Sequence, residues 1–225
     1  SIVDGEAQHH CAREIARTWA ERIQNPEAAV DAWRKVLEFD PVDQEALEAL
    51  TELCRSLEDW ESFLDHGRAL VAQGHGSPRF RTELGTLCFR LGRDEQGVEL
   101  LRSACQGEEP SIEAARQLEG HYLSRGAYEE AVEAIRAQAK ASRDSEKVEH
   151  LLRAAKLLRD TLRSRTGAME AYREVIAHDS QNREALRYVS DQLYTAGDHA
   201  GAIEGFEAMY ETEKSRSLDD FDDRM

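Results

Sequence analysis

Apolar residues recur along this chain at intervals of three and four, the spacing that gathers them on one face of an α-helix. After Pro41 the apolar positions are Leu47, Leu50, Cys54 and Leu57, followed by Trp60, Phe63, Leu64, Leu70 and Val71. This spacing predicts two amphipathic helices joined at Glu58-Asp59. Prolines number only 4, and no stretch alternates apolar and polar residues between turn signals, so we expect an all-α protein.

One long segment of this pattern occurs twice. Residues 29 to 50, AVDAWRKVLEFDPVDQEALEAL, return 139 positions later as residues 168 to 189, AMEAYREVIAHDSQNREALRYV. The positions identical in the second copy are Ala29, Ala32, Arg34, Val36, Asp40, Glu45, Ala46 and Leu47. The offset is close to four times 34, the period of helical-hairpin repeat arrays. We therefore expect further hairpins between the two copies.

Continuing this register along the chain gives six hairpins. The predicted units span about residues 8–41, 42–76, 77–110, 111–144, 145–180 and 181–211. Small residues are expected where the two helices of a hairpin cross, at Ala29, Gly97, Ala131, Ala168 and Ala202. In the second unit the small and the large residue change places. Phe63 stands at the position of the small residue, and Gly67 stands one turn later, where the other units have a large residue. The first and fifth units share a corner that is one residue longer.

The small-xxx-large spacing of each second helix, the corner GDHAGAIEGF and the closing pair Asp40-Pro41 resemble the tetratricopeptide repeat family. The resemblance covers about residues 8–211, although Ser180 replaces one closing proline and others are displaced to Pro78 and Pro110. It implies an α-α superhelix, a solenoid of about six such hairpins, as a single array over residues 1–211. The concave face of such an array, lined by the first helices, would bind an extended peptide or a partner helix.

The resemblance also indicates which side chains line that groove. They are Arg13, Arg17, Glu48, Glu52, Thr86, Phe89, Arg90, Arg116, Leu123, Arg187, Asp191 and Tyr194. One subfamily grips a peptide carboxylate with Lys and Asn at positions where this chain has Glu48, Glu52, Thr82 and Thr86, so we do not expect a chaperone-tail adaptor. Phe89, Leu123 and Tyr194 are the apolar anchors of this groove, or they pack within their own repeats.

The charge balance restricts the class of partner. Asp and Glu number 45 against 29 Lys and Arg, a formal net charge of −16, which opposes binding to a phosphate backbone. No apolar run approaches the roughly 20 residues that cross a bilayer. We therefore expect a protein or peptide partner, no nucleic acid, no membrane insertion and a cytoplasmic location. A removed signal peptide stays open, because the chain begins without Met.

No residue pattern indicates catalysis, a cofactor or a metal. The 4 cysteines form no C-x-x-C pair, and Cys54 and Cys88 lie 34 residues apart, where a buried apolar residue is expected. His9, His10 and Cys11 are adjacent, so on a helix they point in different directions. The chain contains no G-x-S-x-G, P-loop or H-E-x-x-H motif. We therefore expect a protein that is not an enzyme.

The leading hypothesis is a non-catalytic scaffold or adaptor that binds a peptide or partner protein on its concave face. Two alternatives stay open. The hairpins could be a regulatory or sensor segment of a longer enzyme, or a self-assembly module in which exposed terminal hairpins of a homo-oligomer stack on one another. Residues 212–225 are predicted to be an acidic, disordered tail, in which DDFDD at 219–223 is either solubilising or a docking motif.

Overall fold

The computed structural model describes residues 2–107 and 109–222, and the side chains of residues 5–107 and 109–214. Helices account for most of these residues. They are α1 (Ile2–Arg17), the π-helical segment η1 (Thr18–Ile23), α2 (Pro26–Phe39), α3 (Gln44–Ser56), α4 (Trp60–Ala72), α5 (Pro78–Arg90), α6 (Asp94–Ala104), α7 (Ile112–Ser124), α8 (Tyr128–Ala141), α9 (Asp144–Asp160), α10 (Arg165–His178), α11 (Arg183–Thr195) and α12 (His199–Asp222). The predicted all-α class is confirmed for the described part of the chain.

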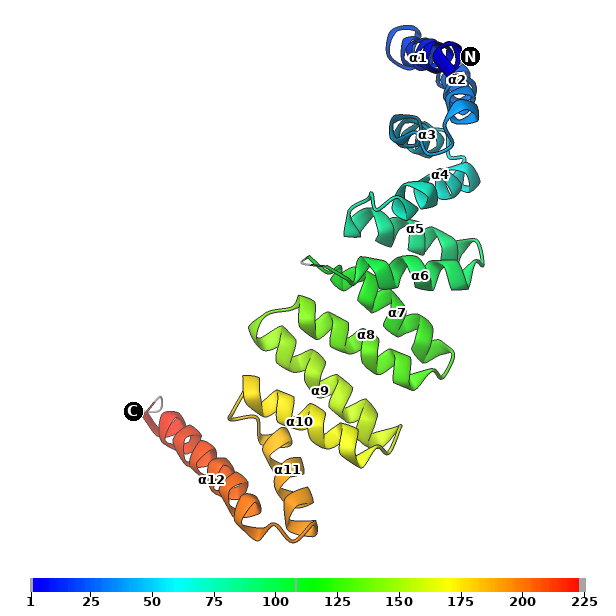
Figure 1. The fold of residues 1–225 in the computed structure, drawn as a ribbon. Coiled ribbons are helices and arrows are strands. Elements are labelled where there is room, and N and C mark those ends of the chain that lie inside the picture. Colours follow the sequence, from blue (N-terminus) through cyan, green and yellow to red (C-terminus); the bar gives the residue numbers. More distant parts are fainter. Residues whose placement is uncertain (1, 108, 223–225) are drawn as a thin grey trace. The chain divides into compact units, whose positions relative to one another are not determined.

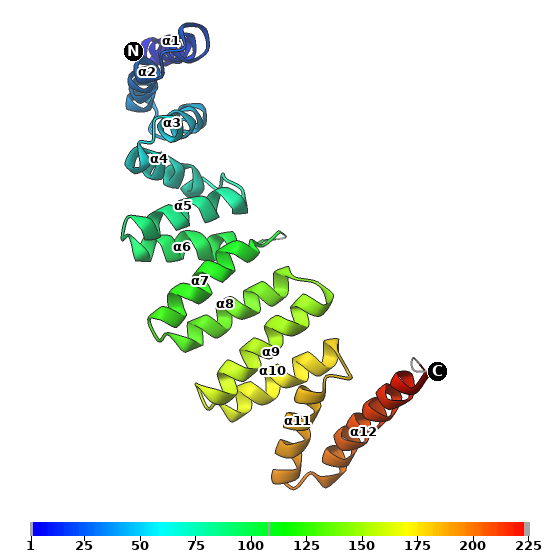
Figure 2. The ribbon, with the colours of Figure 1, turned by 180° about the vertical axis from the view of Figure 1, so that it is seen from behind.

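The helices form two compact units that divide between Ala104 and Cys105. In the first unit α1 packs on α2, α3 on α4, and α5 on α6. In the second unit the pairs are α7 with α8, α9 with α10, and α11 with α12 (Figure 1). Seen from behind, the α11–α12 hairpin ends the second unit (Figure 2). The described part of the chain thus contains six helical hairpins, as the sequence predicts; that they form a single array stays a prediction.

Each hairpin turns at one residue with left-handed backbone. These residues are Gln24, Glu58, Gly92, Gly126, Arg163 and Gly197. The first four follow one another at intervals of 34 residues, and so do the last two. This spacing of helical hairpins is the period of tetratricopeptide repeats. The tetratricopeptide-like fold that the sequence resembles is therefore present in the backbone itself.

The longer corners of the first and fifth hairpins are built by the same hydrogen bond. The Asn25 N–H donates to the Trp19 carbonyl at 3.2 Å, and the Ser164 N–H donates to the Leu158 carbonyl at 2.9 Å. Asn25 and Ser164 then cap α2 and α10 through their side chains. The repeat found in the sequence is therefore also a repeat of local geometry.

We expect the corner residues to respond in opposite directions to substitution. Left-handed backbone costs a residue other than glycine about 1–2 kcal/mol, so Glu58→Gly should raise the free energy of unfolding by up to about 1 kcal/mol. Gly92→Ala should lower it by about 1 kcal/mol. Urea unfolding of both variants measures the two changes. A loss of stability in Glu58→Gly would contradict this interpretation of the corners.

The hairpins pack closely through small residues at the helix crossings and, in the second hairpin, through an exchange of the small and the large residue. Residues at the predicted crossings are buried: Ala29, Gly97, Ala131, Ala168 and Ala202. In the second hairpin Phe63 is fully buried, and a Cβ added to Gly67 would lie 2.7 Å from a Leu84 methyl carbon. The predicted exchange of volumes between Phe63 and Gly67 is confirmed. Cys54 and Cys88 are buried free thiols, and burial raises the pKa of each.

The last helix runs further than the sequence pattern indicates. α12 continues to Asp222, through part of the stretch for which a disordered tail is predicted. The rest of that stretch, residues 223–225, lies outside the described residues, as do the side chains of the DDFDD segment. Both ideas about the tail stay predictions. Among the described helices, none is both long enough and apolar enough to cross a membrane.

Candidate functional site

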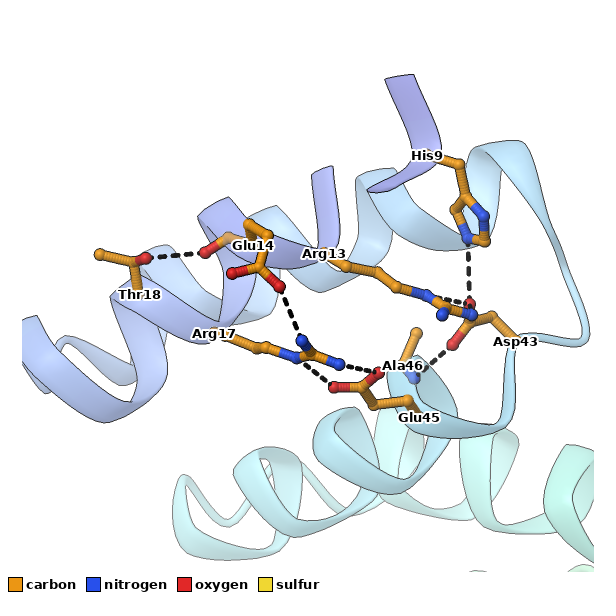
Figure 3. A network of polar contacts seen from close by, with 8 residues as sticks. All are labelled: His9, Arg13, Glu14, Arg17, Thr18, Asp43, Glu45 and Ala46. Carbon is orange, nitrogen blue, oxygen red and sulfur yellow. Dashed lines mark hydrogen bonds and ion pairs between the residues drawn. The ribbon is translucent and has the colours of Figure 1, made fainter. Parts of the chain in front are cut away.

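A buried carboxylate joins the first hairpin to the second. Asp43 precedes α3, and its Oδ1 accepts a hydrogen bond from the Ala46 N–H at 2.9 Å. Its Oδ2 accepts from Arg13 Nε at 2.7 Å and lies 3.0 Å from His9 Nε2. The Asp43 side chain has no exposed surface, and Figure 3 shows Arg13 and His9 of α1 both directed at it. A buried carboxylate needs such partners to offset its lost hydration.

The Asp43 carboxyl is held in its charged form. Burial alone would raise its pKa, but the hydrogen bonds from Ala46 and Arg13 and the Arg13 charge outweigh burial, so the pKa lies below its usual value. At neutral pH the group is therefore an anion facing one permanent cation. This arrangement fixes α1 against the first turn of α3.

A second ion pair lies one helical turn along α1. Arg17 donates from Nε to Glu45 Oε1 at 2.6 Å and from Nη2 to Oε2 at 2.7 Å, a two-point contact. Its Nη1 donates to Glu14 at 2.7 Å. The hydrogen bond from Arg17 lowers the pKa of Glu45. Arg13 and Arg17, predicted from the sequence to line a groove, are thus each engaged within their own unit.

The fifth hairpin shows which part of this network is retained. In the 139-residue register Lys156 replaces Arg17 and Glu184 replaces Glu45. Lys156 Nζ lies 2.8 Å from Glu184 Oε2, so the ion pair is kept.

The buried carboxylate has no counterpart there. Asn182 takes the place of Asp43, and its Oδ1 accepts a hydrogen bond from the Ala185 N–H at 3.2 Å. The residues in register with His9 and Arg13 are Val148 and Leu152. Where the acid becomes a neutral amide, the arginine and the histidine that face it are replaced by apolar residues. We infer that Arg13 and His9 serve to pair Asp43.

Three groups near this network have the composition of a metal site. Ligand atoms of His9, Asp40 and Asp43 lie within 4.8 Å of one another. The Arg13 guanidinium already occupies Asp43 Oδ2, and its positive charge opposes a metal cation at the same oxygen. His10 and Cys11, the neighbours of His9 in sequence, are exposed and stay outside the cluster. The chemistry of the donors fits an ion-pair network better than a metal centre.

Several other predicted groove residues form exposed pairs within their own helices. Gln44 donates to Glu48 at 2.8 Å, Arg55 lies 3.7 Å from Glu52, Arg116 lies 2.8 Å from Glu113, and Arg187 lies 3.9 Å from Asp191. Exposed pairs of this kind contribute about 0–1 kcal/mol each. An approaching partner can therefore replace them at little cost.

Two predicted groove residues, Thr86 and Arg90, line a hollow of about 540 Å³ between α4 and α5. The other lining residues are Trp60, Phe63, Glu83, Leu87 and Leu91. The α5 members lie three, four and seven positions apart, which places them on one face of the helix. Trp60 and Leu91 are partly exposed to solvent. We call this site the α4–α5 hollow.

The sequence pattern places Trp60 among the apolar positions of an amphipathic helix and does not select Trp60, Glu83 or Leu91 as groove residues. Trp60 is the first residue of α4, directly after the capping Asp59. Because a helical side chain leans over the turn on its N-terminal side, an aromatic residue at the first position has no preceding turn to cover. That position was the signal for a half-exposed anchor.

The three predicted apolar anchors differ in their surroundings. Phe89 packs inside the third hairpin, since a Cβ added to Gly97 would lie 2.7 Å from its ring. Leu123 and Tyr194 are exposed. They belong to the second unit, whereas the α4–α5 hollow belongs to the first.

A further hollow of about 630 Å³ lies around the start of α9. Its lining combines the cations Arg143 and Lys147 with the carboxylates of Asp144 and Asp179. It contains no aromatic anchor beyond His178. Its mixed charge favours neither an anion nor a cation.

Comparison with known proteins finds likeness only among solved structures: no family model matches the sequence, and no curated protein matches it. YrrB, described as a TPR protein with an unusual peptide-binding site, is 19% identical with a TM-score of 0.43, over 76% of this chain and 87% of that one. A tetratricopeptide repeat protein from Parabacteroides merdae is 12% identical with a TM-score of 0.42, over 91% and 79%. MamA is 16% identical with a TM-score of 0.40, over 91% and 97%. Function is therefore inferred from the surfaces of this chain.

Proposed function

We propose that the protein is a non-catalytic interaction scaffold and that its α4–α5 hollow binds a segment of a partner protein. The observation that carries the proposal is the half-exposed Trp60 beside Leu91 in a hollow of about 540 Å³. Aromatic side chains with an open apolar surface are the residues that most often anchor protein interfaces. The net charge of −16 favours a polypeptide over a nucleic acid as the partner.

The charges of the hollow indicate what kind of segment fits. Glu83 is already paired with Arg55 at 2.9 Å. Arg90, on the same face of α5, is exposed and forms no ion pair among the described residues. A segment with an apolar side chain for Trp60 and Leu91, next to an acidic residue for Arg90, would meet both requirements. The apolar contact supplies affinity, and the charge sets the direction of the segment.

Selection from a random peptide library tests the proposal. Peptides bound by the intact protein should carry an apolar residue beside an acidic one. Trp60→Ala and Arg90→Glu should each weaken their binding by about tenfold or more in calorimetry. Tyr194→Ala is the control, since Tyr194 is also an exposed aromatic residue but lies outside the hollow, and the affinity of this variant for the peptides should not change. Peptides that bind Trp60→Ala as tightly as the intact protein would refute the proposal.

A further inference from the structure

The last helix exposes a row of large apolar side chains. Ile203, Phe206 and Tyr210 are 54%, 40% and 66% exposed. Their spacing of three and four residues places them on one face of α12. Three large apolar residues in a row on one exposed face are typical of an interaction surface.

The chain itself contains the buried counterpart of this row. When the left-handed corners Gly126 and Gly197 are aligned, Ile203, Phe206 and Tyr210 fall in register with Val132, Ile135 and Ala139 of α8. Those three residues are only 3%, 3% and 2% exposed. They are buried because α8 packs against α9, which lies beside it in Figure 1. The row on α12 is therefore built to receive a helix that corresponds to α9.

The chain also contains a helix that corresponds to α9. Leu151, Ala154 and Ala155 of α9 share apolar clusters with the α8 row. In the 139-residue register their counterparts on α1 are Ala12, Ile15 and Ala16. Ala154 is fully buried, whereas Ile15 is 55% exposed.

A hollow of about 450 Å³ marks this face of the first hairpin. Its lining includes Ala12, Ile15, Trp19, Lys35 and Phe39. The volumes also compensate. Tyr210 is larger than its counterpart Ala139, and Ala12 is smaller than its counterpart Leu151. We call this surface of α1 and α2 the acceptor face and the exposed row on α12 the donor face. The acceptor face is open and has room for the larger side chain of Tyr210.

The charges across the two faces are complementary. In the α8–α9–α10 packing, Arg136 Nη2 lies 3.8 Å from Glu174 Oε1. When the corners Gly126 and Gly197 are aligned, Arg136 corresponds to Glu207 on α12, and in the 139-residue register Glu174 corresponds to Lys35 on α2. Both charges are reversed. The attraction within the α8–α9–α10 packing, which serves as the template, is therefore matched by an attraction between Glu207 and Lys35.

We propose that copies of this chain join head to tail, with α12 of one copy docking on α1 and α2 of a second copy as α8 docks on α9 and α10. The two faces are different surfaces, so each copy keeps one face open and the association can extend beyond a dimer. This surface is separate from the α4–α5 hollow and does not depend on the proposed peptide binding.

The contact should be weaker than its template. The buried Glu119 accepts hydrogen bonds from Gln138 at 2.6 Å and from Arg153, which ties α7 and α8 to α9. The residues in register are Ser190, Met209 and Glu14, which cannot form that bridge. Since apolar contacts and one ion pair remain, we expect a dissociation constant on the order of micromolar.

Blocking each face separately gives a decisive test. Ile203→Glu blocks the donor face and Ile15→Glu blocks the acceptor face, and both residues are exposed enough for the fold to tolerate glutamate. In sedimentation velocity over a concentration series, the intact chain should form dimers and longer species, and each variant alone should stay monomeric. An equimolar mixture should form a dimer and nothing larger, because it contains one intact face of each kind.

Circular dichroism confirms that both variants are folded. A mixture of folded variants that stays monomeric would overturn the proposal, as would an intact chain that is monomeric at every concentration.

The reversed charges give a second, independent test. Lys35→Glu or Glu207→Lys alone should raise the dissociation constant several-fold, at least about threefold, because each places like charges opposite one another. The variant carrying both changes should recover the affinity of the intact chain. A double variant that associates no better than the single ones would show that Lys35 and Glu207 do not meet.

Discussion

Arg13→Leu is expected to lower the free energy of unfolding by about 2–3 kcal/mol, since it leaves the Asp43 carboxylate buried without its permanent cation. The loss is below the full cost of an unpaired buried charge because the Ala46 N–H and His9 still face the carboxylate. Urea unfolding followed by circular dichroism measures the change. A loss below about 0.5 kcal/mol would mean that Asp43 does not depend on Arg13.

The fifth hairpin supplies the matched control for this variant. Arg13→Leu combined with Asp43→Asn reproduces the pair Leu152 and Asn182, so it should recover most of the lost stability.

The double variant and the intact protein together test how stability depends on pH. Because the pKa of Asp43 is lowered in the folded state, its stabilisation is present above the usual aspartate pKa and is lost as the pH falls through the lowered value. The double variant should lose less stability in acid than the intact protein. Equal losses would contradict the assignment.

Gly97→Leu is expected to destabilise the third hairpin by about 3 kcal/mol, because α5 and α6 touch there through their backbones. A Cβ at Gly97 would lie 2.7 Å from the Phe89 ring and 3.1 Å from the Gly85 carbonyl oxygen. The ring can turn aside, but the carbonyl belongs to the helix and can move only if the two helices separate. Thermal unfolding measures the loss.

Gly120→Ala is the control for this effect. Gly120 also lies within a helix, yet apart from its chain neighbours and the nearby backbone of its own helix, no atom lies within 4 Å of the Cβ that alanine would add. This substitution should raise the stability by about 0.5–1 kcal/mol, because alanine has the higher helix propensity. If Gly97→Leu were as stable as the intact protein, the close approach of α5 and α6 would not hold the hairpin.

Local signals made the hairpins predictable from the sequence. The polar residues Asp43, Asp59 and Ser111 cap the helices that follow them, and the first four left-handed corners, like the last two, lie 34 residues apart. The exchange of volumes between Phe63 and Gly67 was also readable, because both lie on the repeated register. Such signals act within one hairpin, so a single sequence suffices to locate them.

The partners of the charged residues were not predictable in the same way. Arg13 reaches Asp43 and Arg17 reaches Glu45 across 30 and 28 residues. The sequence predicts that both arginines lie on the first helix and line the groove for a partner, but it does not show the carboxylates that pair with them. The division of the chain between Ala104 and Cys105 was not predicted either. Tertiary packing decides which carboxylates the arginines meet, and no local pattern records it.

Hydrogen exchange in the presence of a selected peptide tests the central claim, peptide binding at the α4–α5 hollow, most directly. Saturating peptide should slow amide exchange in α4 and α5, around Trp60 and Arg90, and should leave α7 to α11 unchanged. Slower exchange confined to the second unit, around Leu123 and Tyr194, would contradict the claim and place the binding surface there.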